Sequence, residues 1–174
     1  MVTGGRRLML LRHAKSDWAD AETADAERPL SRDGREACKL VAEHVSVERL
    51  APDLILCSSA LRTRQTLQRL ASALPPEVPV LTEDRLYLAG PDELLARLRE
   101  VDDGVPSLLL VGHNPGIHAL AVGLLPPADR VKIPTFPTGA LAVLDLGTRR
   151  WAELGPASTR FDSFVTPRSL RHAL

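Results

Sequence analysis

The chain has 174 residues, 44% of them hydrophobic, and its 22 lysines and arginines balance its 22 aspartates and glutamates. This length predicts a single domain over residues 1–174, with residues 1–6 as a flexible tail. Because the net charge is zero, no overall field attracts nucleic acid or an anionic membrane, and neither is expected as a partner. No apolar run resembles a membrane span or a signal peptide, which predicts a cytoplasmic protein.

Three segments share one pattern, in which an apolar run is followed by polar or small residues and then by helical spacing. The apolar runs are residues 8–11, 54–57 and 108–111. Continuous apolar runs are typical of strands that are buried on both faces of a parallel sheet. Their alternation with helices predicts an α/β fold, a three-layer sandwich with a mostly parallel central sheet.

The remaining segments predict further elements. Ser31 is a candidate N-cap of a helix that ends before Pro52, and Asp92 of another that runs to Gly104. Residues 140–146 are interpreted as a strand near the edge of the sheet, and residues 164–167 as an extended tail. The acidic residues 17–27 are interpreted as a solvated loop, with a lid that faces a partner as the alternative.

Charged side chains follow the three predicted strands. Arg12 and His13 follow the first strand, Arg62 opens the helix after the second, and His113 follows the third. Each of these alone is better explained by a surface ion pair or a structural histidine. Carboxyl ends of parallel strands meet at one edge of a sheet, so together they predict one shared pocket. Arginine forks in such a pocket suit a phosphoryl group, whose oxygens accept paired hydrogen bonds.

Other chemistries do not match the spacing of the residues. The chain has no G-x-x-x-x-G-K-[ST] phosphate loop. Four residues separate Cys57 from Arg62, whereas cysteine-based phosphatases have five, so Cys57 and Cys38 are interpreted as structural. His113 and His118 are five positions apart, not the four that align two zinc ligands on a helix. We therefore expect no metal and no cofactor.

Four ordered motifs resemble those of the histidine phosphatase (phosphoglycerate mutase-like) superfamily. Residues 11–16, Leu-Arg-His-Ala-Lys-Ser, are similar to its Arg-His-Gly signature, in the variant of small SixA-type phosphohistidine phosphatases. Residues 28–34 resemble its R-P-L-[ST]-x-x-G segment, residues 57–66 its second arginine motif and residues 111–115 its second histidine motif. The resemblance covers nearly the whole chain and implies a phosphoglycerate mutase-like fold.

The resemblance also implies roles for individual residues. His13 would be the nucleophile that accepts the phosphoryl group, and His113 would complete the pocket. The phosphoryl oxygens would be held by three arginines, Arg12, Arg28 and Arg62. Ser16 and Asn114, which stand within the same motifs, are assigned to substrate binding.

Two positions depart from the family pattern. Ala14 replaces the glycine of the signature, and it is small enough to let the backbone approach a phosphate. Asp84, three residues before Tyr87, is the candidate general acid, in place of a longer glutamate, with Glu83 as its rival. The alternative is that both acids are exposed loop residues. An ester needs such an acid because an alkoxide leaves poorly, whereas a phosphoimidazole has a nitrogen leaving group that is easily protonated.

The expected function is a phosphatase that removes phosphate from phosphohistidine in proteins. Only about 20 residues separate Tyr87 from the third strand, which leaves little room for a cap that would enclose a small substrate. One alternative is a phosphomonoesterase for a small phosphorylated metabolite. The other is a catalytically idle module that binds phosphate.

Overall fold

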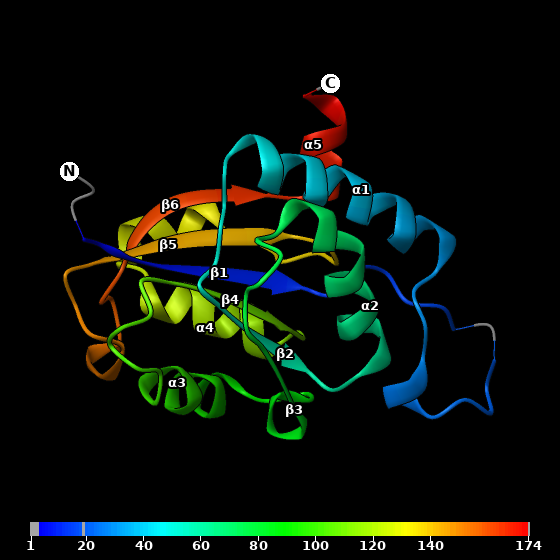
Figure 1. Cartoon of the computed structure of the whole chain (residues 1–174), viewed down its shortest axis with the longest axis horizontal. Helices are drawn as coiled ribbons and strands as arrows, with labels where there is room; N and C mark the ends of the chain where they lie inside the picture. The colour runs from blue at the N-terminus through cyan, green and yellow to red at the C-terminus, as the bar shows by residue number, and fades with distance from the viewer. Residues whose placement is uncertain (1–3, 19, 174) are drawn as a thin grey trace.

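The computed structural model describes residues 4–18 and 20–173, and they form helices packed on a six-stranded sheet (Figure 1). In chain order the elements are β1 (Arg6–Arg12), α1 (Arg32–Val47), β2 (Leu54–Ser58), α2 (Leu61–Leu70), β3 (Val80–Glu83), α3 (Pro91–Arg99), β4 (Ser107–Gly112), α4 (Gly116–Leu124), β5 (Leu141–Gly147), β6 (Arg160–Val165) and α5 (Pro167–His172). Short 3-10 helices lie between them. No helix in this described part is long and apolar enough to cross a membrane.

The sheet has the strand order β3-β2-β4-β1-β5-β6. Strand β1 pairs in parallel with β4, β4 with β2, and β2 with β3, while β5 runs antiparallel to both β1 and β6. The predicted α/β class with a mostly parallel sheet is confirmed. The strand expected near residues 140–146 is β5, which lies one place in from the edge strand β6.

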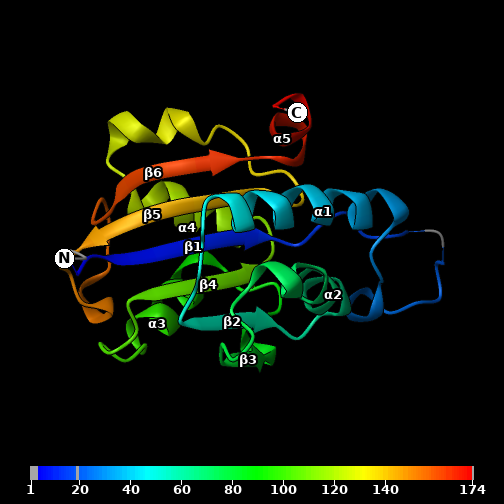
Figure 2. The same ribbon diagram turned by 45° about the horizontal axis from the view of Figure 1, so that its top comes forward.

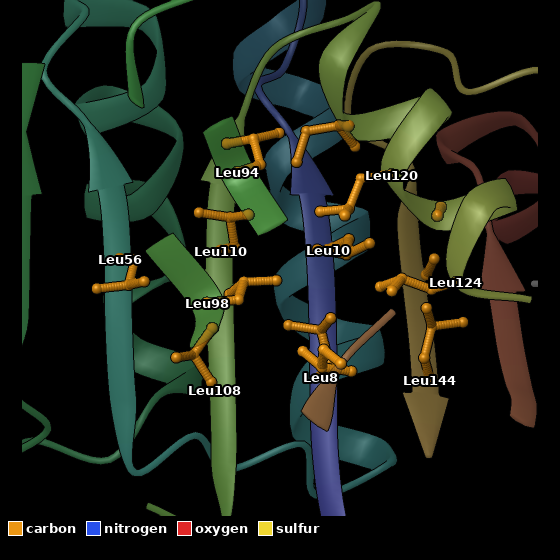
Figure 3. Close-up of a cluster of buried hydrophobic side chains, with 14 of the residues drawn as sticks. Leu8, Leu10, Leu56, Leu94, Leu98, Leu108, Leu110, Leu120, Leu124 and Leu144 are labelled. Atoms are coloured by element: carbon orange, nitrogen blue, oxygen red, sulfur yellow. The ribbon is translucent and has the colours of Figure 1, made fainter. Parts of the chain in front are cut away.

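The apolar runs of the central strands supply both faces of the sheet. Because side chains alternate along a strand, Leu8 and Leu10 pack on one face and Met9 and Leu11 on the other. Helices α3 and α4 cover the first face (Figure 3), and α1, α2 and α5 contribute to the second. The expected three-layer arrangement is therefore confirmed.

The two central strands send their following helices to opposite faces of the sheet. Strand β1 leads to α1 on one face, and its neighbour β4 leads to α4 on the other. A crevice forms at the carboxyl ends of two such strands, where ligands of open α/β sheets bind. The ends of β1, β2 and β4 point to the same side of the molecule, where the loop after β1 also lies (Figure 2). The His13 amide closes the base of this crevice by donating to the Gly112 carbonyl at 3.1 Å.

The start of α1 is built against the loop that follows β1. Ser31 caps the helix as predicted, because its Oγ accepts from the Gly34 amide at 3.0 Å. A side chain at Gly34 would collide with the Lys15 carbonyl, so the glycine allows this close approach. The Ser31 amide donates to that same carbonyl at 2.9 Å. The helix thus fixes the loop that carries the first motif.

Some elements differ from the sequence predictions. Strand β3 was not predicted because it is a short edge strand with little burial, and β6 and α5 replace an extended tail. The N-cap of helix α3 is Gly90, two residues before the predicted Asp92. Of the expected flexible tail, residues 1–3 lie outside the described residues, but Arg6 begins β1. Its guanidinium donates to the carbonyls of Arg149 at 2.9 Å and Asp103 at 2.8 Å, which anchors the segment.

Candidate active site

The imidazole of His13 lies buried just beyond the end of β1. Its Nδ1 lies 2.7 Å from the Ala14 carbonyl oxygen, which can only accept, so Nδ1 carries the proton and Nε2 keeps its lone pair. Burial, reinforced by the arginines Arg62, Arg12 and Arg28, lowers the pKa of His13 to about 4. The ring is therefore neutral at pH 7, with a free nitrogen suited to nucleophilic attack.

His113 lies beside His13, with 5.3 Å between the ring centroids. Its Nδ1 lies 3.4 Å from Nη2 of Arg62, and because a guanidinium only donates, this nitrogen is the acceptor. The opposite nitrogen, Nε2, then donates to Oγ of Ser58 at 2.7 Å. Burial, with the charge that His13 carries once it is protonated and the charge of Arg62, lowers the pKa of His113 to about 3. Both rings are thus neutral and fixed in one orientation.

Arg62 and Arg28 converge on one carboxylate, that of Asp25. Arg62 donates to its Oδ2 at 3.0 Å and to its backbone carbonyl at 2.7 Å. Arg28 donates to Oδ1 of Asp25 at 3.0 Å and to Oγ of Ser16 at 2.6 Å. Both arginine side chains are buried, and each has few ways to rotate because its nitrogens are already bound. The two predicted phosphoryl-binding forks are therefore held in place before any substrate arrives.

Asp25 belongs to the acidic segment 17–27, which we expected to be a solvated loop. A short 3-10 helix (Asp25–Glu27) turns this one carboxylate into the site, so the expectation is wrong at Asp25. The hydroxyl of Tyr87 donates to it as well, and this bond, with those from Arg62 and Arg28, lowers the pKa of Asp25 to about 2. Asp25 is therefore ionised at neutral pH.

Arg12 and Asn114 line the side of the site nearest to β5. Arg12 Nη1 donates to the Phe136 carbonyl at 3.0 Å, and Asn114 Nδ2 donates to the same oxygen at 2.8 Å. Burial and the charge of Arg62 lower the pKa of Arg12, so its positive charge is partly desolvated. A desolvated cation interacts more strongly with an anion than one in water does.

These side chains enclose a pocket of about 230 Å³. Its lining consists of Arg12, His13, Lys15, Ser16, Trp18, Asp25, Arg28, Arg62, Leu88, His113, Asn114 and Thr138. The structure thus brings together every predicted site residue except Asp84. Within the described residues, no group of histidine, cysteine, aspartate or glutamate side chains is placed to hold a metal ion.

Asp84 lies outside this pocket. It is an exposed residue at the start of a 3-10 helix (Asp84–Leu86), whose turn directs Tyr87 toward the site instead. Its rival Glu83 accepts hydrogen bonds from Arg97 at 2.8 Å and Arg85 at 2.8 Å. The role of Asp84 as a general acid stays a prediction, and the lining of the pocket does not favour it.

Several residues of the site were not singled out from the sequence. Ser58 orients His113, and Thr66 Oγ1 accepts from the Ala14 amide at 3.0 Å, next to the nucleophile. Both stand inside the second arginine motif, which was the available signal. Asp25 and Tyr87 act through contacts between segments that are distant in the sequence, and no local sequence pattern predicts such contacts. Cys57 is buried and its pKa is raised to about 12 by burial, consistent with its structural interpretation.

Comparisons with known proteins agree with this geometry. The family model of the histidine phosphatase superfamily (branch 1) matches residues 8–87. An uncharacterized protein of Mycobacterium tuberculosis is 34% identical over 165 residues, 91% of this chain and 100% of that protein. The phosphohistidine phosphatase SixA of Escherichia coli is 28% identical over 163 residues, 88% of this chain and 96% of that protein.

A solved structure agrees over a similar span. It is that of a candidate phosphohistidine phosphatase, SixA, from Nakamurella multipartitia, with a TM-score of 0.83 and 32% sequence identity. The match covers 94% of this chain and 96% of that one. The same family is indicated by the four motifs, by the fold and by the paired histidines between buried arginines. The chain therefore belongs to the histidine phosphatase superfamily, branch 1, among its SixA-type members.

Proposed function

We propose that this chain removes the phosphoryl group from phosphohistidine carried on proteins, with His13 as the transient acceptor. The observation that carries the proposal is the ionisation of Asp25. Among the described residues it is the one carboxylate that lines the pocket, and with a pKa of about 2 it has no proton to give at neutral pH. A leaving group that needs no carboxylic acid fits this pocket best.

In the first step Nε2 of His13 attacks phosphorus, in line with the bond that breaks. A P–N bond to His13 forms as the P–N bond of the substrate breaks, and the electron pair goes to the leaving imidazole nitrogen, which takes a proton from water. Nη1 of Arg62 and both Nη atoms of Arg28 each carry a second N–H besides the one bound to Asp25 or to Ser16. Those hydrogens, with Arg12, would hold the phosphoryl oxygens and stabilise the charge of the transition state.

In the second step water attacks the phosphorus atom, the P–N bond to His13 breaks, and inorganic phosphate leaves. The electron pair returns to Nε2, which restores the neutral ring. Asp25 is a positioning residue in both steps, because it fixes the two guanidinium forks. After this step the ring of His13, whose pKa is about 4, stays unprotonated and is ready as the nucleophile of the next turnover.

An ester of an aliphatic alcohol presents a different demand. Its alkoxide is a poor leaving group unless an acid protonates it during the reaction. Asp25 is ionised, and the exposed Asp84 lies outside the pocket. The small-metabolite esterase is for this reason the weaker of the two enzyme hypotheses.

The test measures phosphate release, without added metal, from a histidine-phosphorylated protein and from glycerol phosphate. We expect the wild type to hydrolyse the phosphoprotein and not the ester, and His13→Ala to lose this activity. His172→Ala, which removes an exposed imidazole, is the matched control and should retain it. Faster hydrolysis of the ester would favour the metabolite phosphatase. Phosphate binding without turnover of either compound would favour the idle module.

A further inference from the structure

Two large apolar side chains stand exposed at the mouth of the catalytic pocket. Trp18 is 76% exposed and Leu88 is 56% exposed, and both belong to the pocket lining. Isolated exposed apolar residues are common on protein surfaces. Here two of them, from segments far apart in the sequence, border the same small opening, and the other lining residues are mostly polar or charged.

Trp18 contacts a residue of the site directly, and Leu88 directly follows a residue that is bound to the site. The indole of Trp18 stacks on the guanidinium of Arg28, which covers one face of the ring and leaves the rest open. Leu88 has a φ of 51°, a left-handed conformation that is costly for a bulky residue. Its neighbour Tyr87 is bound to Asp25, so the chain enters this turn from a fixed point.

The size of the pocket determines where the carrier of the phosphoryl group must lie. A volume of about 230 Å³ admits a phosphoryl group and a ring but not a polypeptide. With the phosphorus atom at His13, the backbone that carries the substrate histidine would leave through the opening of the pocket, whose exposed lining includes Trp18 and Leu88. A protein surface would then cover both side chains, whereas a free amino acid would barely reach them.

We propose that Trp18 and Leu88 form an apolar docking rim for the protein that carries the phosphohistidine. This inference rests on the proposed function and adds the chemistry of the partner: aliphatic or aromatic side chains flank the phosphorylated histidine on its surface. Covering apolar surface at the rim lowers KM for the protein substrate. The rim thereby distinguishes phosphohistidine in a protein from free phosphohistidine, which has the same reacting atoms.

The experiment compares kcat/KM on two substrates phosphorylated with phosphoramidate. One is a helical protein domain whose phosphorylated histidine has apolar neighbours, and the other is the free amino acid histidine. The decisive variant is Leu88→Gly, because glycine adopts a positive φ without strain and the fold is retained. We expect kcat/KM to fall about tenfold on the protein, through KM, and to change less than about twofold on free phosphohistidine.

Two further variants complete the test. Trp18→Ala uncovers Arg28 and so can change both kcat/KM values. Its readout is therefore the kcat/KM on the protein divided by the kcat/KM on free phosphohistidine, and this ratio should fall at least about fivefold. Val131→Ala removes another apolar side chain that is 77% exposed but does not line the pocket, and it should leave both values unchanged.

Failure of the rim differs from failure of the proposed function. If the wild type hydrolyses the phosphoprotein and Leu88→Gly does so equally well, or if this variant loses as much on free phosphohistidine, the docking rim is refuted while the function stands. If the wild type hydrolyses free phosphohistidine or esters but not the phosphoprotein, the function itself is wrong in its substrate, and the rim is refuted with it.

Discussion

Two clusters of arginines and carboxylates differ in the balance of their charges. The pocket cluster consists of Arg28 and Arg62 around the single carboxylate of Asp25. The surface cluster, between the end of β3 and the carboxyl end of α3, pairs Arg85 and Arg97 with Glu83 and Glu100. The shortest ion-pair distances are similar, 3.0 Å in the first cluster and 2.7 Å in the second. Geometry alone therefore does not separate an anion site from a structural network.

The charge balance separates them. The pocket cluster keeps an excess of positive charge in a buried place, and Arg12 adds to it. The surface cluster is neutral as a whole, since each arginine already has a carboxylate. A phosphoryl group supplies the charge that the first cluster lacks and would be redundant in the second. An arginine cluster with a deficit of carboxylates is thus the better guide to an anion site.

The largest effect expected from this comparison concerns one arginine from each cluster. Arg62→Met should lower kcat/KM about 10³-fold, because the variant loses a preorganised donor to the transition state. Arg85→Met in the surface cluster should change kcat/KM less than about twofold and leave the stability nearly unchanged, as is usual for exposed ion pairs. Steady-state kinetics and urea unfolding of the two variants test the contrast. Equal losses of activity would show that charge balance does not identify the site.

The next effect is a dependence of stability on pH that comes from the pocket. Between pH 6.5 and 4 the unfolded chain binds protons at His13 and His113, while the folded chain, with pKa values of about 4 and 3, does not. The free energy of unfolding therefore falls as the pH drops through this window, by about 2.5 kcal/mol for each ring and about 5 kcal/mol in all between pH 7 and 4.5. The carboxylates of both clusters have lowered pKa values. Their contribution to the free energy of unfolding is therefore lost as the pH falls from the pKa of the unfolded chain toward these lowered values.

Urea unfolding at several pH values measures this dependence. A His13→Gln, His113→Gln double variant should show a much flatter profile between pH 4.5 and 6.5. A wild type whose stability is constant over that range would contradict the buried, neutral state of the two rings.

A smaller effect is expected from the carboxylate that the pocket arginines share. Asp25→Asn keeps the size of the side chain but weakens its hold on Arg28 and Arg62. We expect kcat to fall about tenfold from the loss of positioning. Inorganic phosphate should inhibit at least as strongly as in the wild type, because a negative charge has been removed. Weaker phosphate inhibition together with an unchanged kcat would rule out a positioning role.

The smallest effect is expected at Asp84, which is close in sequence to the surface cluster. Asp84→Asn should leave phosphohistidine hydrolysis within about twofold of the wild type, since the side chain is exposed and does not line the pocket. Phosphate release from the same phosphoprotein measures it. A tenfold or larger loss would restore Asp84 as a participant in the reaction.

Much of the fold and the centre of the site could be predicted from the sequence. Strands β1, β2 and β4 are buried on both faces and therefore appear as continuous apolar runs, and the residues at their ends include His13, Arg62 and His113. The edge strands β3 and β6 are less buried, so their sequences lack this signal. A predicted general acid at Asp84 depended on the direction of side chains in a 3-10 turn, which spacing alone does not fix.

The role of Asp25 was hidden for a related reason. The segment 17–27 has no hydrophobic periodicity, and its conformation is set by bonds to the adjacent Arg28 and to Arg62 and Tyr87, which belong to other parts of the fold. A loop whose shape depends on such distant partners has the same composition as a solvated one. The excess of arginines over carboxylates among the predicted site residues could have suggested that an acid lies nearby. It could not have shown which acid of the loop this is.

The most direct test of the account is to identify the residue that carries the phosphoryl group. Excess enzyme is mixed with a radiolabelled phosphohistidine protein, quenched in alkali within a single turnover and mapped by peptide analysis. The account predicts alkali-stable label on His13, and neither label nor phosphate release in His13→Ala. Label on His113 or another residue, or release by His13→Ala at the wild-type rate, would contradict the assignment of the nucleophile and with it the proposed mechanism.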